Sequence, residues 1–160
     1  MSHNEEIINV LNAIAVDSKE STWTDAAWTK EIKNRLSGLG HEKKFLVYAS
    51  SASGVDGGEW LYDLTWLNYS NKNLIDVELV LESEWTFNNI DDDFQKLLLA
   101  KSELRVLIFQ AKDKLLADKK IVDLKRQISR FTKSFSGDQY LLSCWVYGSG
   151  EFFHTEYTHK

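Results

Sequence analysis

EWLYDLTWLNYSNKNLIDVELVLESEW, residues 59–85, is the stretch that decides the predicted fold. Its two ends, residues 59–66 and 76–85, are rich in leucine, valine and aromatic residues, whereas residues 67–75 are rich in Asn and Ser. This composition predicts two strands joined by a polar loop. Acidic residues interrupt both strands, although carboxylates rarely occupy buried positions unless they are paired. Their placement therefore needs a physical reason.

The residues before this stretch predict two helices. Residues 5–16 and 25–39 both carry apolar side chains at helical spacing. Thr24 is the expected N-cap of the second helix. Gly38 and Gly40 are expected to mark its end, because glycine is favoured just after the last helical turn.

Residues 44–50 predict a further strand, which the glycine-rich turn 51–58 connects to the quoted stretch. The three strands are expected to form an antiparallel meander. Downstream, Asp91-Asp92-Asp93 predicts the start of a helix over 93–102, because short acidic residues cap the free amides of a first turn. Residues 104–109 (LRVLIF) are a nearly continuous apolar run. Such a run is typical of an internal strand paired in parallel after a helical crossover.

The longest predicted helix follows and is expected to end at Ser136-Gly137-Asp138. Its apolar stripe has alternating spacings of four and three residues and consists of Ala117, Ile121, Leu124, Ile128, Phe131 and Phe135. This stripe is expected to lie in the core, although its spacing also suits the seam of a homodimer. A strand over 139–148 and an aromatic tail over 151–157, a candidate sixth strand, complete the chain. The predicted order is α-α-β-β-β-α-β-α-β, an α/β fold with a mixed β-sheet flanked by helices.

Length and composition favour a single domain over residues 1–160, with an N-terminal helix within 1–20 and a core over 24–148. The 160 residues are 43% hydrophobic and 27% charged, the balance of a soluble globular protein. No segment predicts a membrane span or a secretory signal, and the single cysteine, Cys144, cannot form an internal disulfide. We therefore expect a cytoplasmic protein without a membrane partner.

The charges are unevenly distributed along the chain. The net charge is −5, but the first 100 residues contain 8 Lys or Arg and 17 Asp or Glu, whereas the last 60 contain 11 and 7. Many of the later cations lie on the long helix, largely off its apolar stripe: Lys119, Lys120, Arg126, Arg130 and Lys133. A patch of this kind predicts contacts with the phosphates of DNA. The alternative is a solvated helix face whose charges pair along the helix.

The acidic residues of the quoted stretch are candidates for a metal site. Alternate residues of a strand share a face, so Glu82 and Glu84 lie on the same face. In a suitable register of the two strands, Asp63 converges with them. Three close carboxylates repel one another unless a cation or a proton compensates, and oxygen ligands select hard ions such as Mg²⁺, Mn²⁺ or Ca²⁺. The alternative is a half-exposed strand whose carboxylates are in water.

Together these features resemble the PD-(D/E)XK nuclease superfamily. A helix with Glu31 precedes a meander that carries Asp63 on one strand and Glu82-x-Glu84 on the next, followed by helix, strand, helix and strand. The resemblance covers residues 24–148 and implies a restriction endonuclease-like fold. It also implies that Asp63 and Glu82 bind Mg²⁺, that Glu84 orients or deprotonates the attacking water, and that Glu31 contributes through a water or a second ion.

The sequence departs from this superfamily at Glu84, where most members carry lysine and some restriction endonucleases carry glutamate. Lys96 on the next predicted helix is a candidate substitute. Its helical phase, however, places it on the outer face, away from Phe94 and Leu98. The implied activity is Mg²⁺-dependent hydrolysis of phosphodiester bonds in DNA.

A non-catalytic interaction protein is the alternative function. Such a protein would be an acidic partner of the immunity or antitoxin kind, or a degenerate nuclease fold that binds another protein. The acidic first 100 residues favour this alternative, because their charge repels DNA.

Overall fold

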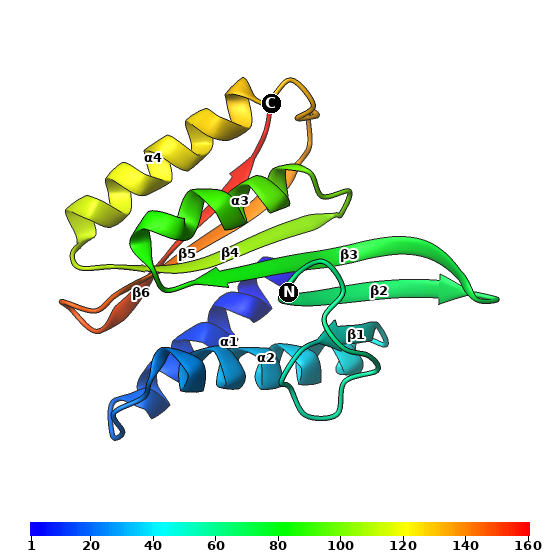
Figure 1. Ribbon diagram of the computed structural model, residues 1–160, viewed down its shortest axis with the longest axis horizontal. Helices are drawn as coiled ribbons and strands as arrows, with labels where there is room; N and C mark the ends of the chain where they lie inside the picture. Colours follow the sequence, from blue (N-terminus) through cyan, green and yellow to red (C-terminus); the bar gives the residue numbers. More distant parts are fainter. The chain divides into compact units, whose positions relative to one another are not determined.

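The computed structural model describes residues 1–160 as two compact units, Met1–Val80 and Leu81–Lys160. Six strands form one sheet in the order β1-β2-β3-β4-β5-β6, and helices flank the strands (Figure 1). The sheet contains both parallel and antiparallel pairs. The predicted α/β class with a mixed, helix-flanked sheet is therefore confirmed. None of the helices is long and apolar enough to cross a membrane.

Unit 1 consists of α1 (His3–Ser18), α2 (Asp25–Glu42), β1 (Leu46–Ala49), β2 (Leu64–Ser70) and most of β3 (Asn73–Glu84). Both helices have side-chain caps, because Ser2 forms a capping box with Glu5 and Thr24 accepts a hydrogen bond from the Ala27 amide. β1 and β2 pair antiparallel, as the predicted meander requires. The core of the unit includes Ile7, Leu11, Ile14, Ile32, Leu36 and Trp66.

The second helix does not end at its glycines, so that part of the prediction was wrong. α2 continues through Gly38 and Gly40. Gly40 is buried, and a Cβ atom there would lie 2.6 Å from Trp66 Nε1 and 2.8 Å from Val47 Cγ2. The glycine therefore permits a close approach between helix and sheet. The same Trp66 indole donates a hydrogen bond to the Leu36 carbonyl at 3.2 Å.

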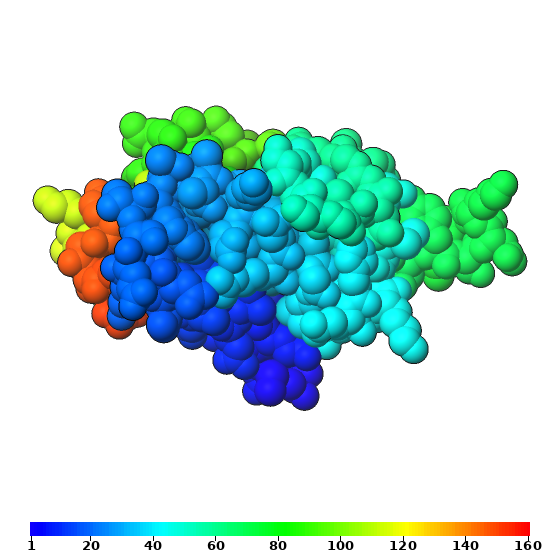
Figure 2. Space-filling view, turned by 90° about the horizontal axis from the view of Figure 1, so that it is seen from below, coloured from blue at the N-terminus to red at the C-terminus, as the bar shows by residue number.

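The hairpin of β2 and β3 differs from the two predicted strands. Residues 67–75, predicted as a loop, belong mostly to the strands, and only Asn71 and Lys72 form the turn, with φ angles of 49° and 67°. Two left-handed residues in succession are typical of tight turns that match the twist of a hairpin. Residues 59–63, predicted as part of the first strand of the hairpin, lie before the start of β2. Among them, Leu61 is 73% exposed and has a φ angle of 66°. In Figure 2 the hairpin tip projects from the rest of unit 1.

Unit 2 contains the end of β3, the 3-10 helix η1 (Phe87–Asn89), α3 (Ile90–Leu98), β4 (Leu104–Ala111), α4 (Lys114–Arg130), β5 (Gln139–Val146) and β6 (Glu151–Thr158). β4 and β5 pair in parallel, with α4 as the crossover between them. This arrangement confirms the prediction from the apolar run in β4. The candidate sixth strand is β6, which pairs antiparallel with β5 at the sheet edge.

The long helix is shorter than predicted. α4 ends at Arg130, and the Ser134 hydroxyl donates to the Ile128 carbonyl at 2.7 Å, which satisfies one of the acceptors that a helix end leaves open. Three residues of the predicted stripe, Ala117, Leu124 and Ile128, are buried. Phe135 lies beyond the helix and is 70% exposed, so its place in the stripe was predicted wrongly.

Candidate functional site

Asp63, the predicted motif aspartate, lies beside a buried lysine of unit 1. It directly precedes β2, and its side chain is 22% exposed. Lys33 of α2 is almost fully buried, and its Nζ lies 3.8 Å from Asp63 Oδ1. The same ammonium donates to the Ser50 hydroxyl at 3.1 Å and lies 3.4 Å from the Ser50 carbonyl oxygen. Burial removes the ammonium from water, and these partners offset that cost, so Lys33 and Asp63 form one ion pair.

Lys33 was not predicted from the sequence as a partner of Asp63, because the two residues are 30 positions apart along the chain. Lys33 directly follows Ile32, a member of the apolar stripe of α2. A lysine that borders a buried stripe was the available signal.

Glu31, the predicted helix glutamate, is engaged on its own helix. Its Oε1 accepts a hydrogen bond from Arg35 Nε at 2.6 Å, and Arg35 also reaches Asp17 at 2.5 Å. Partial burial alone would lower the pKa of Arg35, but its bonds to Asp17 and Glu31 raise it. This network links α1 to α2, so Glu31 has a structural role in orienting Arg35.

Glu82, the first glutamate of the predicted motif, is a buried carboxylate near the end of β3. Its side chain is 3% exposed and follows the fully buried Leu81. Lys96 Nζ of α3 lies 3.7 Å from Glu82 Oε1 and 2.7 Å from Asp93 Oδ1. The alternative of a half-exposed strand with its carboxylates in water therefore does not hold for Glu82, which is buried beside a lysine.

The approach of Lys96 corrects an expectation drawn from helical phase. The side chain is half exposed, as an outer position requires, yet its ammonium still reaches Glu82. The phase of a helix fixes the direction of the Cβ atom, whereas the long flexible stem of lysine carries the charge several ångströms further. The Lys96 ammonium thus lies near Glu82, the first glutamate of the predicted motif.

Glu84 is half-buried, and its Oε1 accepts a hydrogen bond from the Thr86 amide at 2.6 Å. Glu82 and Glu84 belong to unit 2, whereas Asp63 belongs to unit 1. The convergence of the three carboxylates therefore stays a prediction. No group of three or more Asp, Glu, His or Cys side chains that could hold a metal ion is present. A Mg²⁺ site formed by Asp63 and Glu82 therefore also stays a prediction.

The remaining acids of β3 have partners within unit 1. Glu78 lies 2.9 Å from His3 Nε2, and its side chain is only 20% exposed. Asp76 is half-buried, and its side chain accepts a hydrogen bond from the Val77 amide.

The five predicted DNA-binding cations do not form one uniform patch. Lys119 and Arg130 are exposed on α4. Lys120 is 10% exposed, pairs with Asp91 at 3.0 Å and lies over the Phe87 ring, so it has a structural role. The two others are Arg126, which pairs with Asp123 at 3.4 Å, and Lys133, which lies in the loop after α4.

A serine and a histidine also meet in unit 2, which sequence reasoning did not find. Ser143 Oγ and His154 Nδ1 lie 2.9 Å apart on the neighbouring strands β5 and β6. Burial lowers the pKa of His154 to about 4, so its imidazole is neutral at physiological pH. Ser143 is completely buried and therefore out of reach of a substrate as a nucleophile.

No match was found when the chain was compared with protein-family models, curated proteins and solved structures. The resemblance to the PD-(D/E)XK superfamily therefore stays a prediction from the sequence.

Proposed function

We propose that this chain is a Mg²⁺-dependent nuclease-like domain that hydrolyses phosphodiester bonds of DNA. The observation that supports this most is the buried Glu82 carboxylate at the end of β3 with the Lys96 ammonium 3.7 Å away. Burying a carboxylate costs free energy, and a stable fold has no need of one inside an apolar strand. Such groups are concentrated at functional sites.

Each proposed residue has a role that follows from its surroundings. Asp63 and Glu82 would hold the metal ion, which supplies polarisation of the scissile phosphate and a more acidic bound water. Lys96 supplies a positive charge beside Glu82 that would attract the phosphate and orient the water. Glu84 would take the proton of that water as a general base. Lys33 holds Asp63 in place and balances part of its charge.

The test is cleavage of supercoiled and single-stranded DNA by the purified chain with Mg²⁺, Mn²⁺ or EDTA. We expect divalent-dependent cleavage that Asp63→Asn and Glu82→Gln abolish, and that Lys96→Met lowers by about 100-fold or more. Glu103→Gln and Lys30→Met are matched controls, because both side chains are exposed and have no assigned role in DNA binding or catalysis. Unfolding curves of every variant separate loss of chemistry from loss of fold. Full activity of Asp63→Asn would contradict the proposal.

A protein-interaction domain is a second candidate, and the β2–β3 hairpin favours it. The tip of this hairpin exposes three large apolar side chains, with exposed fractions of 38% for Tyr69, 41% for Leu74 and 64% for Ile75. Exposed apolar clusters of this kind commonly mark contact surfaces. The two candidates separate in a Mg²⁺ titration monitored by thermal unfolding. A stabilisation that Glu82→Gln removes supports the nuclease, whereas no stabilisation at any Mg²⁺ concentration supports the interaction domain.

A further inference from the structure

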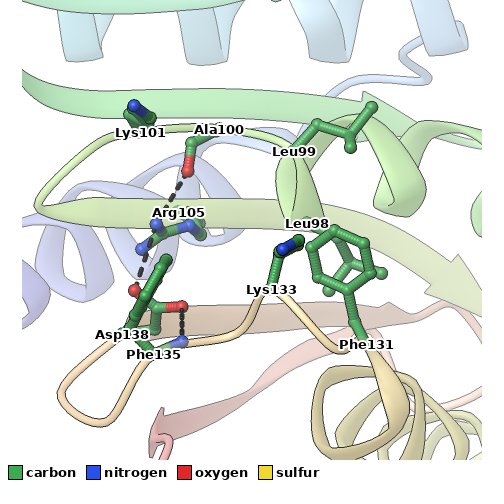
Figure 3. A pocket seen from close by; sticks show the side chains of 9 residues that line it. All are labelled: Leu98, Leu99, Ala100, Lys101, Arg105, Phe131, Lys133, Phe135 and Asp138. Carbon is green, nitrogen blue, oxygen red and sulfur yellow. Dashed lines mark hydrogen bonds and ion pairs between the residues drawn. The ribbon is translucent and has the colours of Figure 1, made fainter.

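Unit 2 contains a pocket of about 320 Å³ that the nuclease proposal does not use (Figure 3). Its lining comes from the end of α3, from Arg105 at the start of β4, and from the segment between α4 and β5. The pocket thus lies at the amino ends of the parallel strands β4 and β5. Active sites of open α/β sheets lie at the opposite, carboxyl ends. Its volume is that of a small-ligand site.

Arg105 is the charged group of this pocket with unused hydrogen-bonding capacity. Its side chain is only 6% exposed. Nη2 donates to the Ala100 carbonyl at 2.7 Å and lies 3.3 Å from Asp138 Oδ1, as the dashed lines in Figure 3 show. Nε and Nη1, in contrast, are buried without a hydrogen-bond partner. Buried guanidinium donors without acceptors are costly, so the site is built to receive one.

The one carboxylate of the pocket cannot supply that acceptor. Asp138 Oδ1 faces Arg105 Nη2, and Asp138 Oδ2 accepts a hydrogen bond from the Phe135 amide at 2.9 Å. On its inner side, the guanidinium lies 5.3 Å from the centre of the Tyr140 ring. The missing acceptor must therefore come from outside the chain.

The charge and shape of the pocket indicate which anion it fits. Lys101 and Lys133 add two exposed cations to Arg105, so the lining carries two positive charges more than negative ones. A phosphate monoester carries nearly two negative charges at neutral pH, and its oxygens match the fork of a guanidinium. Leu99 and Phe135 are 72% and 70% exposed in the same lining, so each adds an accessible apolar side chain to the cations.

We propose that this pocket binds a phosphate monoester attached to a planar ring, of the size of a mononucleotide. The phosphate lies against Arg105 and Lys133, and the ring stacks on Phe135, because aromatic side chains bind bases through their faces. Lys133 and Phe135 have exposed side chains, so rotation of these two opens the way to the guanidinium. The proposal does not rest on nuclease activity.

Calorimetric titration of the full chain at low salt tests this site, with adenosine 5′-monophosphate, inorganic phosphate and adenosine as probes. The monophosphate is expected to bind at least about tenfold more tightly than inorganic phosphate, because the ring adds contacts, and adenosine alone more weakly than both. Lys133→Glu should weaken both phosphate-bearing probes by about tenfold or more. Phe135→Ala should weaken only the monophosphate. Lys30→Glu, at an exposed lysine outside the pocket, is the control and should change nothing.

Arg105→Gln is the variant closest to the chemistry, but it can destabilise a buried position, so the exposed Lys133 and Phe135 decide the outcome. Three results would overturn the proposal. One is the absence of saturable binding of the monophosphate up to about 10 mM, which is weaker than a specific site of this charge allows. Another is equal weakening by Lys133→Glu and Lys30→Glu. The third is phosphate binding as tight as that of the monophosphate and indifferent to Phe135→Ala.

Discussion

The two glycines of α2 allow a sharp prediction, because they lie two residues apart in one helix with opposite surroundings. Ala in place of Gly38 meets nothing within 4 Å and should stabilise the helix by up to about 1 kcal/mol, the difference in helix propensity. At Gly40 the same gain is opposed by a methyl group 2.6 Å from Trp66 Nε1. Overpacking of this kind costs about 1–3 kcal/mol. Displacing Trp66 also strains its bond to Leu36, and a buried donor left unpaired costs about 1–3 kcal/mol more.

Gly40→Ala should therefore lower the free energy of unfolding by roughly 1–5 kcal/mol, the sum of these opposing contributions. Urea unfolding followed by far-ultraviolet circular dichroism measures both variants against the natural chain. In thermal unfolding each 1 kcal/mol corresponds to a shift of about 2–4 °C for a chain of this length. The reasoning is refuted if Gly40→Ala is as stable as Gly38→Ala, since then the contact with Trp66 exerts no constraint.

Three further predictions concern other parts of the chain. Burial lowers the pKa of His154 from 6.5 to about 4, so the unfolded chain binds this proton more readily than the folded chain. The contribution of His154 to stability should therefore be complete above about pH 6.5 and be lost as the pH falls toward 4. His154→Gln should reduce the difference between the urea midpoints measured at about pH 7.5 and pH 5. Lys72→Gly should raise the melting temperature, because glycine removes about 1 kcal/mol of left-handed backbone strain. Lys120→Ala should cost about 1 kcal/mol through the lost pair with Asp91, whereas Lys119→Ala should leave the melting temperature unchanged.

Local sequence was sufficient to predict an element whose burial on both faces requires a continuous apolar run. The run LRVLIF of β4 is buried on both faces, and only an internal strand explains such a run. The hairpin boundaries were not accessible in this way. Its turn, Asn71-Lys72, contains no glycine, and the polar residues around it, such as Asn68 and Asn73, resemble a loop in composition although they pair in strands. Solvent exposure at the tip allows polar residues in a strand, which composition alone cannot distinguish from a loop.

The candidate site shows the same limit more clearly. Asp63 and Glu82 could be selected because acids inside apolar strands are unusual in a single sequence. Lys33 could not be selected, since it is distant in sequence from Asp63. Lys96 was named as a candidate, but its helical phase argued against a contact with Glu82. Contacts between long side chains of different elements depend on the packing of the whole chain, so they cannot be predicted from residue spacing within one element.

The β2–β3 hairpin has a consequence for how this chain tolerates changes in length. Its two-residue turn joins strands whose side chains alternate between faces, so adding or removing one residue on each strand moves the turn without disturbing the pairs below it. A length change on one strand only would reverse the faces of every residue beyond it. Evolution, or an engineer inserting a peptide tag, can therefore lengthen the chain at Asn71-Lys72 in matched steps at little cost to the core.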